Sequence, residues 1–187
     1  MKQSWKPGNL LNPTPVVMLS CAAEGEKPNI ITLAWVGTVN SEPPMLSVSI
    51  RKERFSHHQV KESGEFVVNL VSAALAKACD WCGVRSGRDV DKFSAMGLTA
   101  LTAPNLSLAP QIAESPVSIE CRVEHVLELG SHDMFIGRIV GVQVDESLLD
   151  TGGKLDLTKA GLIVYSHGEY FGLGEKLGRF GWSVKKK

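Results

Sequence analysis

Residues 117–124 alternate apolar and polar side chains without interruption, and the apolar phase continues as far as Leu129. A period of two residues is that of a β-strand, in which successive side chains point to opposite faces of a sheet. Residues 46–51 show the same alternation. The two segments predict long strands that each place one face against a core, and they favour a fold built on an antiparallel sheet.

Shorter apolar runs bounded by Gly and Pro turns supply the other strand candidates. These candidates are residues 16–21, 29–36, 66–71, 134–144 and 162–165. The segments lack the helix after each strand that a parallel α/β sheet requires. The pattern therefore predicts one mainly β domain over residues 1–187, an antiparallel barrel with a few short helices. Side chains fill the interior of such small barrels, so a large ligand is expected outside the barrel or between subunits.

Two or three short helices are expected, and two of them can be placed. Residues 56–59 form a capping-box pattern, in which the Ser56 hydroxyl caps the third helical amide, Gln59 reaches back, and Gly64 ends the helix. A second helix is expected to start at Ser72 and end at Gly83. It would present one apolar side formed by Leu75, Ala78, Cys79 and Cys82.

The overall charge argues against polyanionic partners. Twenty Lys and Arg residues balance twenty Asp and Glu residues, so there is no global field to attract nucleic acid. The N-terminal residues lack the apolar core of a signal peptide, and no apolar segment is long enough to span a bilayer. Four cysteines are too few for a disulfide framework in a chain of this length. We therefore expect a cytoplasmic protein with reduced thiols and neither nucleic-acid nor membrane partners.

A basic segment lies beside the expected start of the first helix. Arg51, Lys52 and Arg54 precede the two histidines at positions 57 and 58. Helix N-termini favour anions, and an arginine can hold a phosphate with two hydrogen bonds. The segment is consistent with a phosphate site, although charge runs of this kind are usually solvated turns.

The segment 29–35 places Thr32 and Ala34 on one face of a strand and Trp35 on the other. Small side chains would let a flat ring approach the backbone. Trp35 would either stack on such a ring or fill the core.

His132 follows Gly130 in a turn just before a strand. A histidine in this position can meet a substrate and donate a proton or a hydrogen bond, or it can be an ordinary surface side chain.

The CxxC pair of Cys79 and Cys82 raises the possibility of metal binding or thiol redox chemistry. A structural zinc site normally needs a second pair of ligands, and Cys21 and Cys121 lie apart on expected strands. We therefore expect no metal site and predict that Cys79 and Cys82 are buried on one helix face.

Taken together, several blocks resemble the flavin reductase-like family, and within it flavoredoxin-type proteins. The likeness lies in the order and spacing of residues 29–35, 44–51, 56–57, 66–70, 89–93 and 130–132. It spans about residues 8–175. The resemblance implies an FMN-binding split β-barrel of Greek-key-like topology, usually a homodimer with flavin in a groove near the subunit interface.

The resemblance also implies which residues contact flavin. They are Thr32, Leu33, Ala34, Trp35, Ser49, Ile50, Arg51, Phe55, Ser56, Lys92 and Phe93. In this assignment the phosphate meets Arg51, the Ser56 hydroxyl and the amides at the helix start, and Lys92 stabilises the anionic reduced flavin. His132 matches the histidine of the family's Gly-Asp-His turn at the nicotinamide or substrate side, although Ser131 occupies the middle position and an aspartate follows.

The expected activity is that of an FMN-dependent oxidoreductase that transfers hydride from NADH or NADPH to flavin and electrons onward to an acceptor. The alternative is a flavoredoxin-type electron-transfer protein that holds FMN, has no NAD(P)H activity and exchanges electrons with a redox partner protein. A third reading is a zinc or thiol-redox protein built on the CxxC.

Overall fold

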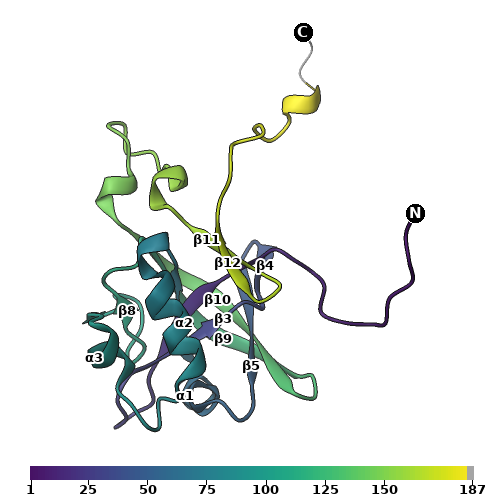
Figure 1. Ribbon diagram of the computed structural model, residues 1–187. Coiled ribbons are helices and arrows are strands. Elements are labelled where there is room, and N and C mark those ends of the chain that lie inside the picture. Colours follow the sequence, from purple (N-terminus) through teal and green to yellow (C-terminus); the bar gives the residue numbers. More distant parts are fainter. Residues whose placement is uncertain (185–187) are drawn as a thin grey trace.

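The computed structural model describes residues 1–184 and shows a curled antiparallel sheet with short helices packed on it (Figure 1). The seven strands of the main sheet run in the order β3-β2-β6-β9-β10-β5-β4. Their bounds are β2 (Val17–Cys21), β3 (Asn29–Leu33), β4 (Val36–Ser41), β5 (Pro44–Arg51), β6 (Glu65–Leu70), β9 (Val117–Glu128) and β10 (His132–Val144).

The two edge strands of this sheet, β3 and β4, are consecutive in the chain. Only Ala34 and Trp35 link them, and the Trp35 carbonyl accepts a hydrogen bond from the Ser49 amide of β5 at 3.0 Å. The sheet therefore curls into a barrel that is split beside this linker.

Smaller elements cover the main sheet. Strands β1 (Thr14–Pro15), β11 (Ile163–Ser166) and β12 (Glu169–Gly172) form a second sheet, and β7 (Ala100–Leu101) pairs with β8 (Gln111–Ile112). The α-helices are α1 (Phe55–Ser63), α2 (Ala76–Val84) and α3 (Lys92–Met96). The 3-10 turns are Ala73–Leu75, Glu146–Leu148, Leu157–Ala160 and Trp182–Val184. The expected mainly β fold with few short helices is confirmed. No helix within residues 1–184 is long and apolar enough to cross a membrane.

Two apolar clusters hold the site-bearing elements together. The first fills the curled sheet with side chains from six strands and from α1, and includes Phe66 and Phe135. The second lies between the sheet and α2, and there Leu75, Ala78, Cys79 and Cys82 are buried, as the sequence predicts. The expected helix start at Ser72 is only partly right, because a 3-10 turn precedes α2.

The expected burial of β9 is wrong over its second half. Pairing of β6 with β9 ends at Arg122, so beyond that residue β9 has only β10 beside it. Leu127 and Leu129 are consequently exposed on a projecting hairpin (Figure 1). The polar face of β9 also differs from the expectation that only its apolar face is buried. Glu120 is fully buried and accepts hydrogen bonds from the Asn105 amide and from Gln143 Nε2.

The expected capping box of α1 is also wrong. The helix begins at Phe55 with Arg54 in the N-cap position, two residues earlier than a cap at Ser56 implies, and no side chain caps it. The Ser56 hydroxyl lies inside the first turn and accepts a hydrogen bond from Asn29 Nδ2, while Gln59 Nε2 donates to Glu26. Tertiary partners have taken the two groups that a capping box would use. The predicted stop is confirmed, because Gly64 ends α1 in the left-handed conformation with a φ of 66°.

Candidate functional site

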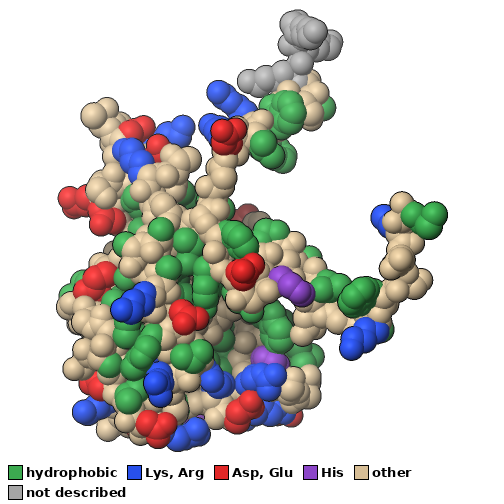
Figure 2. Space-filling view, in the orientation of Figure 1, with side chains coloured by type: hydrophobic (Ala, Val, Ile, Leu, Met, Phe, Trp, Pro, Cys, Tyr) green, Lys and Arg blue, Asp and Glu red, His purple; other side chains and the backbone are tan. Residues whose placement is uncertain are grey.

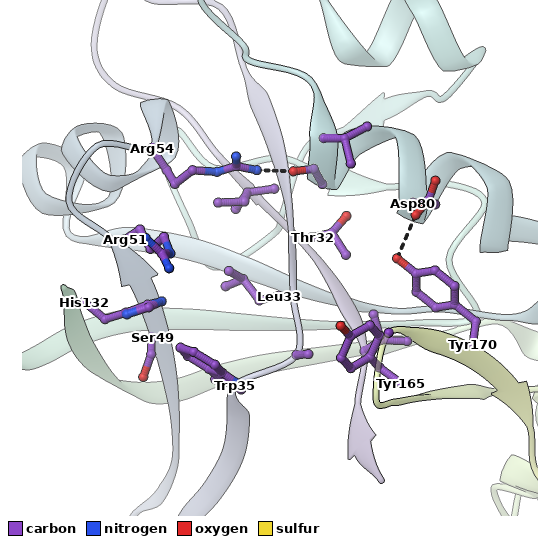
Figure 3. A pocket seen from close by; sticks show the side chains of 16 residues that line it. Thr32, Leu33, Trp35, Ser49, Arg51, Arg54, Asp80, His132, Tyr165 and Tyr170 are labelled. Atoms are coloured by element: carbon purple, nitrogen blue, oxygen red, sulfur yellow. Dashed lines mark hydrogen bonds between the residues drawn. The ribbon is translucent and has the colours of Figure 1, made fainter. Parts of the chain in front are cut away.

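A cavity of about 480 Å³ opens where the barrel is split (Figure 3). Its first wall is formed by the end of β3 and the linker after it, by β5 and by the start of β10. The opposite wall comes from α2 and from the hairpin of β11 and β12. Residues of the first wall are Thr32, Leu33, Ala34, Trp35, Ser49, Arg51 and His132, and those of the second include Asp80, Gly83, Tyr165 and Tyr170.

Strand register explains the polar groups of the first wall. Ser49 and Arg51 share one face of β5 because side chains alternate, and His132 pairs directly opposite Arg51 in the ladder between β5 and β10. The same alternation turns Ile50 into the barrel interior, where it is fully buried. Ser49 and Arg51 of β5 and His132 of β10 therefore all reach the cavity.

Trp35 is not a core residue. Its side chain is 44% exposed, and its ring lies 4.5 Å from the His132 ring, centroid to centroid, with the planes tilted by 51°. Of the two roles left open by the sequence, the structure excludes core filling. An indole and an imidazole instead form one edge of the cavity (Figure 3).

The imidazole of His132 is held in its neutral form. Partial burial, and then the nearby Arg51 guanidinium, lower the pKa of His132 below 6.5, against a smaller opposing effect of Glu53. Ser131 Oγ lies 2.9 Å from Nδ1. At pH 7 this side chain is therefore mostly uncharged, and it can still donate a hydrogen bond.

We expect the ring protons of His132 to titrate in an NMR experiment with a pKa below 6.5, and the Arg51→Ala variant to move that pKa upward. Since the unfolded chain binds this proton more readily, the contribution of His132 to stability is complete above pH 6.5 and declines as the pH falls below it. A pKa of 6.5 or higher in the wild-type protein would contradict this assignment.

The opposite wall of the cavity contains groups that the sequence does not reveal. Tyr170 donates its hydroxyl to Asp80 Oδ1 at 3.1 Å, and the Tyr165 and Tyr170 rings lie 5.7 Å apart, edge to face (Figure 3). Burial, followed by nearby Cys79 and Asp80, raises the pKa of Tyr170. Tyr170 therefore remains protonated and acts as the hydrogen-bond donor to Asp80.

A second cavity of about 210 Å³ lies at the start of α1. Four cations line it, namely Arg54, Arg85, Arg88 and Lys92, together with Asn29, Phe55, Ser56 and the single carboxylate of Glu53. Arg54 lines both cavities and donates a hydrogen bond to the carbonyl of Gly83 on α2. The two cavities therefore adjoin at Arg54 and at Ile31, which also lines both.

Lys92 lies in the second cavity rather than the first. It is only 2% exposed, and its Nζ donates to the carbonyls of Ile30 at 2.6 Å and Cys82 at 2.8 Å. Burial lowers the pKa of Lys92 to about 8, so the amine is still mostly charged at pH 7. Two of its three protons are used, and the third is free for an anion.

The twelve site residues named from the sequence thus divide into three groups. Seven line the first cavity, and they are Thr32, Leu33, Ala34, Trp35, Ser49, Arg51 and His132. Phe55, Ser56 and Lys92 line the second. Ile50 and Phe93 line neither, because both side chains are buried in apolar clusters. As side-chain contacts of a ligand, these last two residues remain predictions without geometric support.

Asp133 is a buried anchor that the sequence did not identify. Its carboxylate lies 2.8 Å from His57 Nε2 and 3.2 Å from Lys52 Nζ. Burial alone would raise the pKa of Asp133, but hydrogen bonds from these two partners hold it below its usual value. Through these contacts Asp133 links α1 and the basic segment to the start of β10, next to His132.

The CxxC cysteines are free thiols in the second apolar cluster. Burial is the main cause that raises the pKa of Cys79 to about 12 and that of Cys82 to about 11. Thiol chemistry needs the thiolate, which is scarce at such pKa values. Among residues 1–184, no group of three or more His, Cys, Asp and Glu side chains is placed to hold a metal ion.

A family model for the flavin reductase like domain matches residues 10–174. Among solved structures, flavoredoxin of Desulfovibrio vulgaris (Miyazaki F) is 34% identical with a TM-score of 0.91, covering 99% of this chain and 100% of that one. Flavoredoxin from Methanosarcina acetivorans is 30% identical with a TM-score of 0.90 and the same coverage. An FMN-binding protein from Thermus thermophilus is 27% identical with a TM-score of 0.79, covering 96% of this chain and 97% of that one. With most of its length matched by the family model, this chain belongs to the flavin reductase-like family.

Proposed function

We propose that this protein is an FMN-dependent oxidoreductase that holds the isoalloxazine ring in the first cavity and the phosphate in the second. The observation that carries the proposal is the pair of cavities meeting at Arg54, one with small and aromatic walls and the other lined by cations. A ligand with a flat ring at one end and a phosphate at the other matches this arrangement. The FMN-binding neighbour from Thermus thermophilus supports the same cofactor.

The first cavity fits the ring in size and lining. Its volume of about 480 Å³ is within the range of small-molecule sites, roughly 300–1,000 Å³. Ala34 leaves room for a ring to approach the backbone, and Trp35 and His132 form its edge. Hydrogen-bond donors at the periphery, including Ser49 and Arg51, can orient polar ring atoms.

The second cavity fits a phosphate. Arg54 and Lys92 supply positive charge, Ser56 supplies a hydroxyl, and the first-turn amides of α1 lie beside them. Arg51 does not line this cavity, and its side chain is paired with Glu53 at 3.2 Å. We therefore assign the phosphate to Arg54, Ser56 and Lys92, and Arg51 to the ring end.

When bound, FMN would supply the redox chemistry, taking hydride from NADH or NADPH and passing the electrons to an acceptor. The protein would bind the cofactor, orient its ring and shield it from water. Neutral His132 can donate a hydrogen bond to the bound ring at the edge of the cavity that it forms together with Trp35. The cations of the second cavity hold the phosphate, and no side chain needs to act as a nucleophile.

The alternative function is a flavoredoxin-type electron carrier that holds FMN without using NAD(P)H. Two flavoredoxins of 34% and 30% identity, each aligned over 99% of this chain, favour it specifically. Anaerobic mixing of FMN-loaded protein with NADH and then NADPH separates the two functions. We expect at least one nicotinamide to bleach the visible flavin absorbance. If neither does, while a chemical reductant does, the protein is the carrier.

We also propose a homodimer, as the family resemblance implies. Residues 1–13 and 173–184 extend from the body and carry apolar side chains on their surface (Figures 1 and 2). Trp5, Leu177 and Phe180 are largely or fully exposed. Apolar side chains of this size on an extended segment gain stability from burial against a partner. Sedimentation is expected to give twice the chain mass of 20.2 kDa, and a monomer at micromolar concentration would contradict the dimer.

A further inference from the structure

Asn29 connects the sheet to the second cavity. It is the first residue of β3, is 3% exposed, and lines the cavity next to Ser56. Its Nδ2 donates a hydrogen bond of 2.8 Å to the Ser56 hydroxyl oxygen. Because that oxygen acts as acceptor in this contact, Asn29 does not use the hydroxyl proton of Ser56.

The surroundings of Ser56 offer few acceptors for this proton. Burial raises the pKa of the Cys21 thiol, and the Ser56 hydroxyl opposes that rise as a hydrogen-bond donor to the sulfur, but a thiol is a weak acceptor. A charged phosphate oxygen forms a shorter and stronger hydrogen bond. The hydroxyl is therefore set up to donate to an anion in the cavity rather than to the protein.

The other end of the Asn29 amide is unsatisfied. Within residues 1–184, Asn29 Oδ1 is buried and accepts no hydrogen bond. Burying an acceptor without a donor is costly, and a phosphate oxygen cannot supply that donor, so the Asn29 amide can face an anion only through its nitrogen side. The loop carrying Arg85 and Arg88 comes close to it through Gly87, where a Cβ atom would collide with Oδ1.

We propose that Asn29 is a positioning residue for the FMN phosphate, whose amide nitrogen fixes the Ser56 hydroxyl so that its proton is donated to a phosphate oxygen. Gly87 leaves the amide room to hold this orientation. The inference rests on the proposed FMN site and extends it to a residue that makes no phosphate contact of its own.

The phosphate preference, the ratio of the dissociation constants of riboflavin and FMN, measures this role. Riboflavin has the same ring and ribityl chain, so losses that concern those parts cancel in the ratio. We expect Ser56→Ala to reduce the preference about tenfold, the loss of one hydrogen bond to a charged group. Asn29→Ala should reduce it severalfold, and the double variant should reduce it no further than Ser56→Ala alone.

Gly87→Ala provides a second variant in case Asn29→Ala does not fold. It keeps both polar side chains but displaces the amide, and it should lower the phosphate preference in the same direction. Inorganic phosphate should compete with FMN for the wild-type protein but more weakly for Ser56→Ala.

Two results would overturn the inference alone: a preference unchanged in folded Asn29→Ala or Gly87→Ala, or losses that multiply in the double variant. Failure of the wild-type protein to bind FMN at all would overturn the proposed function and this inference with it. The FMN titration of the wild-type protein tells these failures apart, because it is positive when only the inference about Asn29 fails.

Discussion

Replacing Lys92 by methionine is expected to weaken FMN binding about 30-fold and to change riboflavin binding by less than about threefold. The amine is buried at the phosphate cavity, with one proton free for an anion. Hydrogen bonds to charged groups contribute about 1.5–3 kcal/mol, and 1.4 kcal/mol corresponds to a factor of ten. Isothermal titration with both flavins measures the effect.

Lys61→Met is the matched control, because Lys61 is exposed on α1 and lines neither cavity. It should leave both affinities unchanged. Lys92→Met also leaves the carbonyls of Ile30 and Cys82 without their donor, so its thermal stability should fall. Equal losses for FMN and riboflavin would contradict the phosphate assignment.

The lowered pKa of Lys92 leads us to expect that FMN affinity depends on pH. With a pKa of about 8 in the free protein, Lys92 loses its charge as the pH rises through 8, so FMN affinity should decline between pH 7 and 9 while riboflavin affinity stays constant. The stability follows the opposite course. Between pH 8 and 10.5 the unfolded chain binds this proton more readily than the folded one, so the free energy of unfolding rises. An FMN affinity that is flat from pH 7 to 9 would contradict the account.

Phe135→Ala is expected to lower the free energy of unfolding by about 3–5 kcal/mol, the usual cost of removing a buried aromatic ring. Phe135 is fully buried at the centre of the first cluster, opposite Val48 of β5, and its ring lies 5.4 Å from that of His57. The substitution would loosen the packing between β5, β10 and α1, the elements that place the site.

Denaturant unfolding measures this loss, with Val142→Ala as the control. Val142 lies on the same strand but is exposed, so its truncation should change stability by no more than about 0.5 kcal/mol. A loss below about 1 kcal/mol in Phe135→Ala would mean that the cluster does not support the site as described.

Local periodicity was enough to predict much of the sheet and the face of β5 that carries Ser49 and Arg51. Alternation in β5 separates Ser49 and Arg51, which reach the first cavity, from Ile50, which does not. The pairing of Arg51 with His132 joins residues far apart in the chain. No local pattern specifies such a register, and the family resemblance alone brought these residues together in advance.

The failures have a common cause in tertiary context. The polar groups of the expected capping box, including the Ser56 hydroxyl, are engaged by residues of other elements. The exposed end of β9 depends on where the neighbouring β6 stops. Tyr170 and Asp80 meet only because the C-terminal hairpin lies against α2. The separation of Lys92 from Arg51 into two cavities likewise depends on packing around Arg54.

The central claim, one FMN spanning two cavities, is tested most directly by titrating the wild-type protein with FMN and with riboflavin. We expect one FMN per chain, bound at least about tenfold more tightly than riboflavin because only FMN fills the cationic cavity with its phosphate. Equal affinities for the two flavins, or no binding of either, would contradict it.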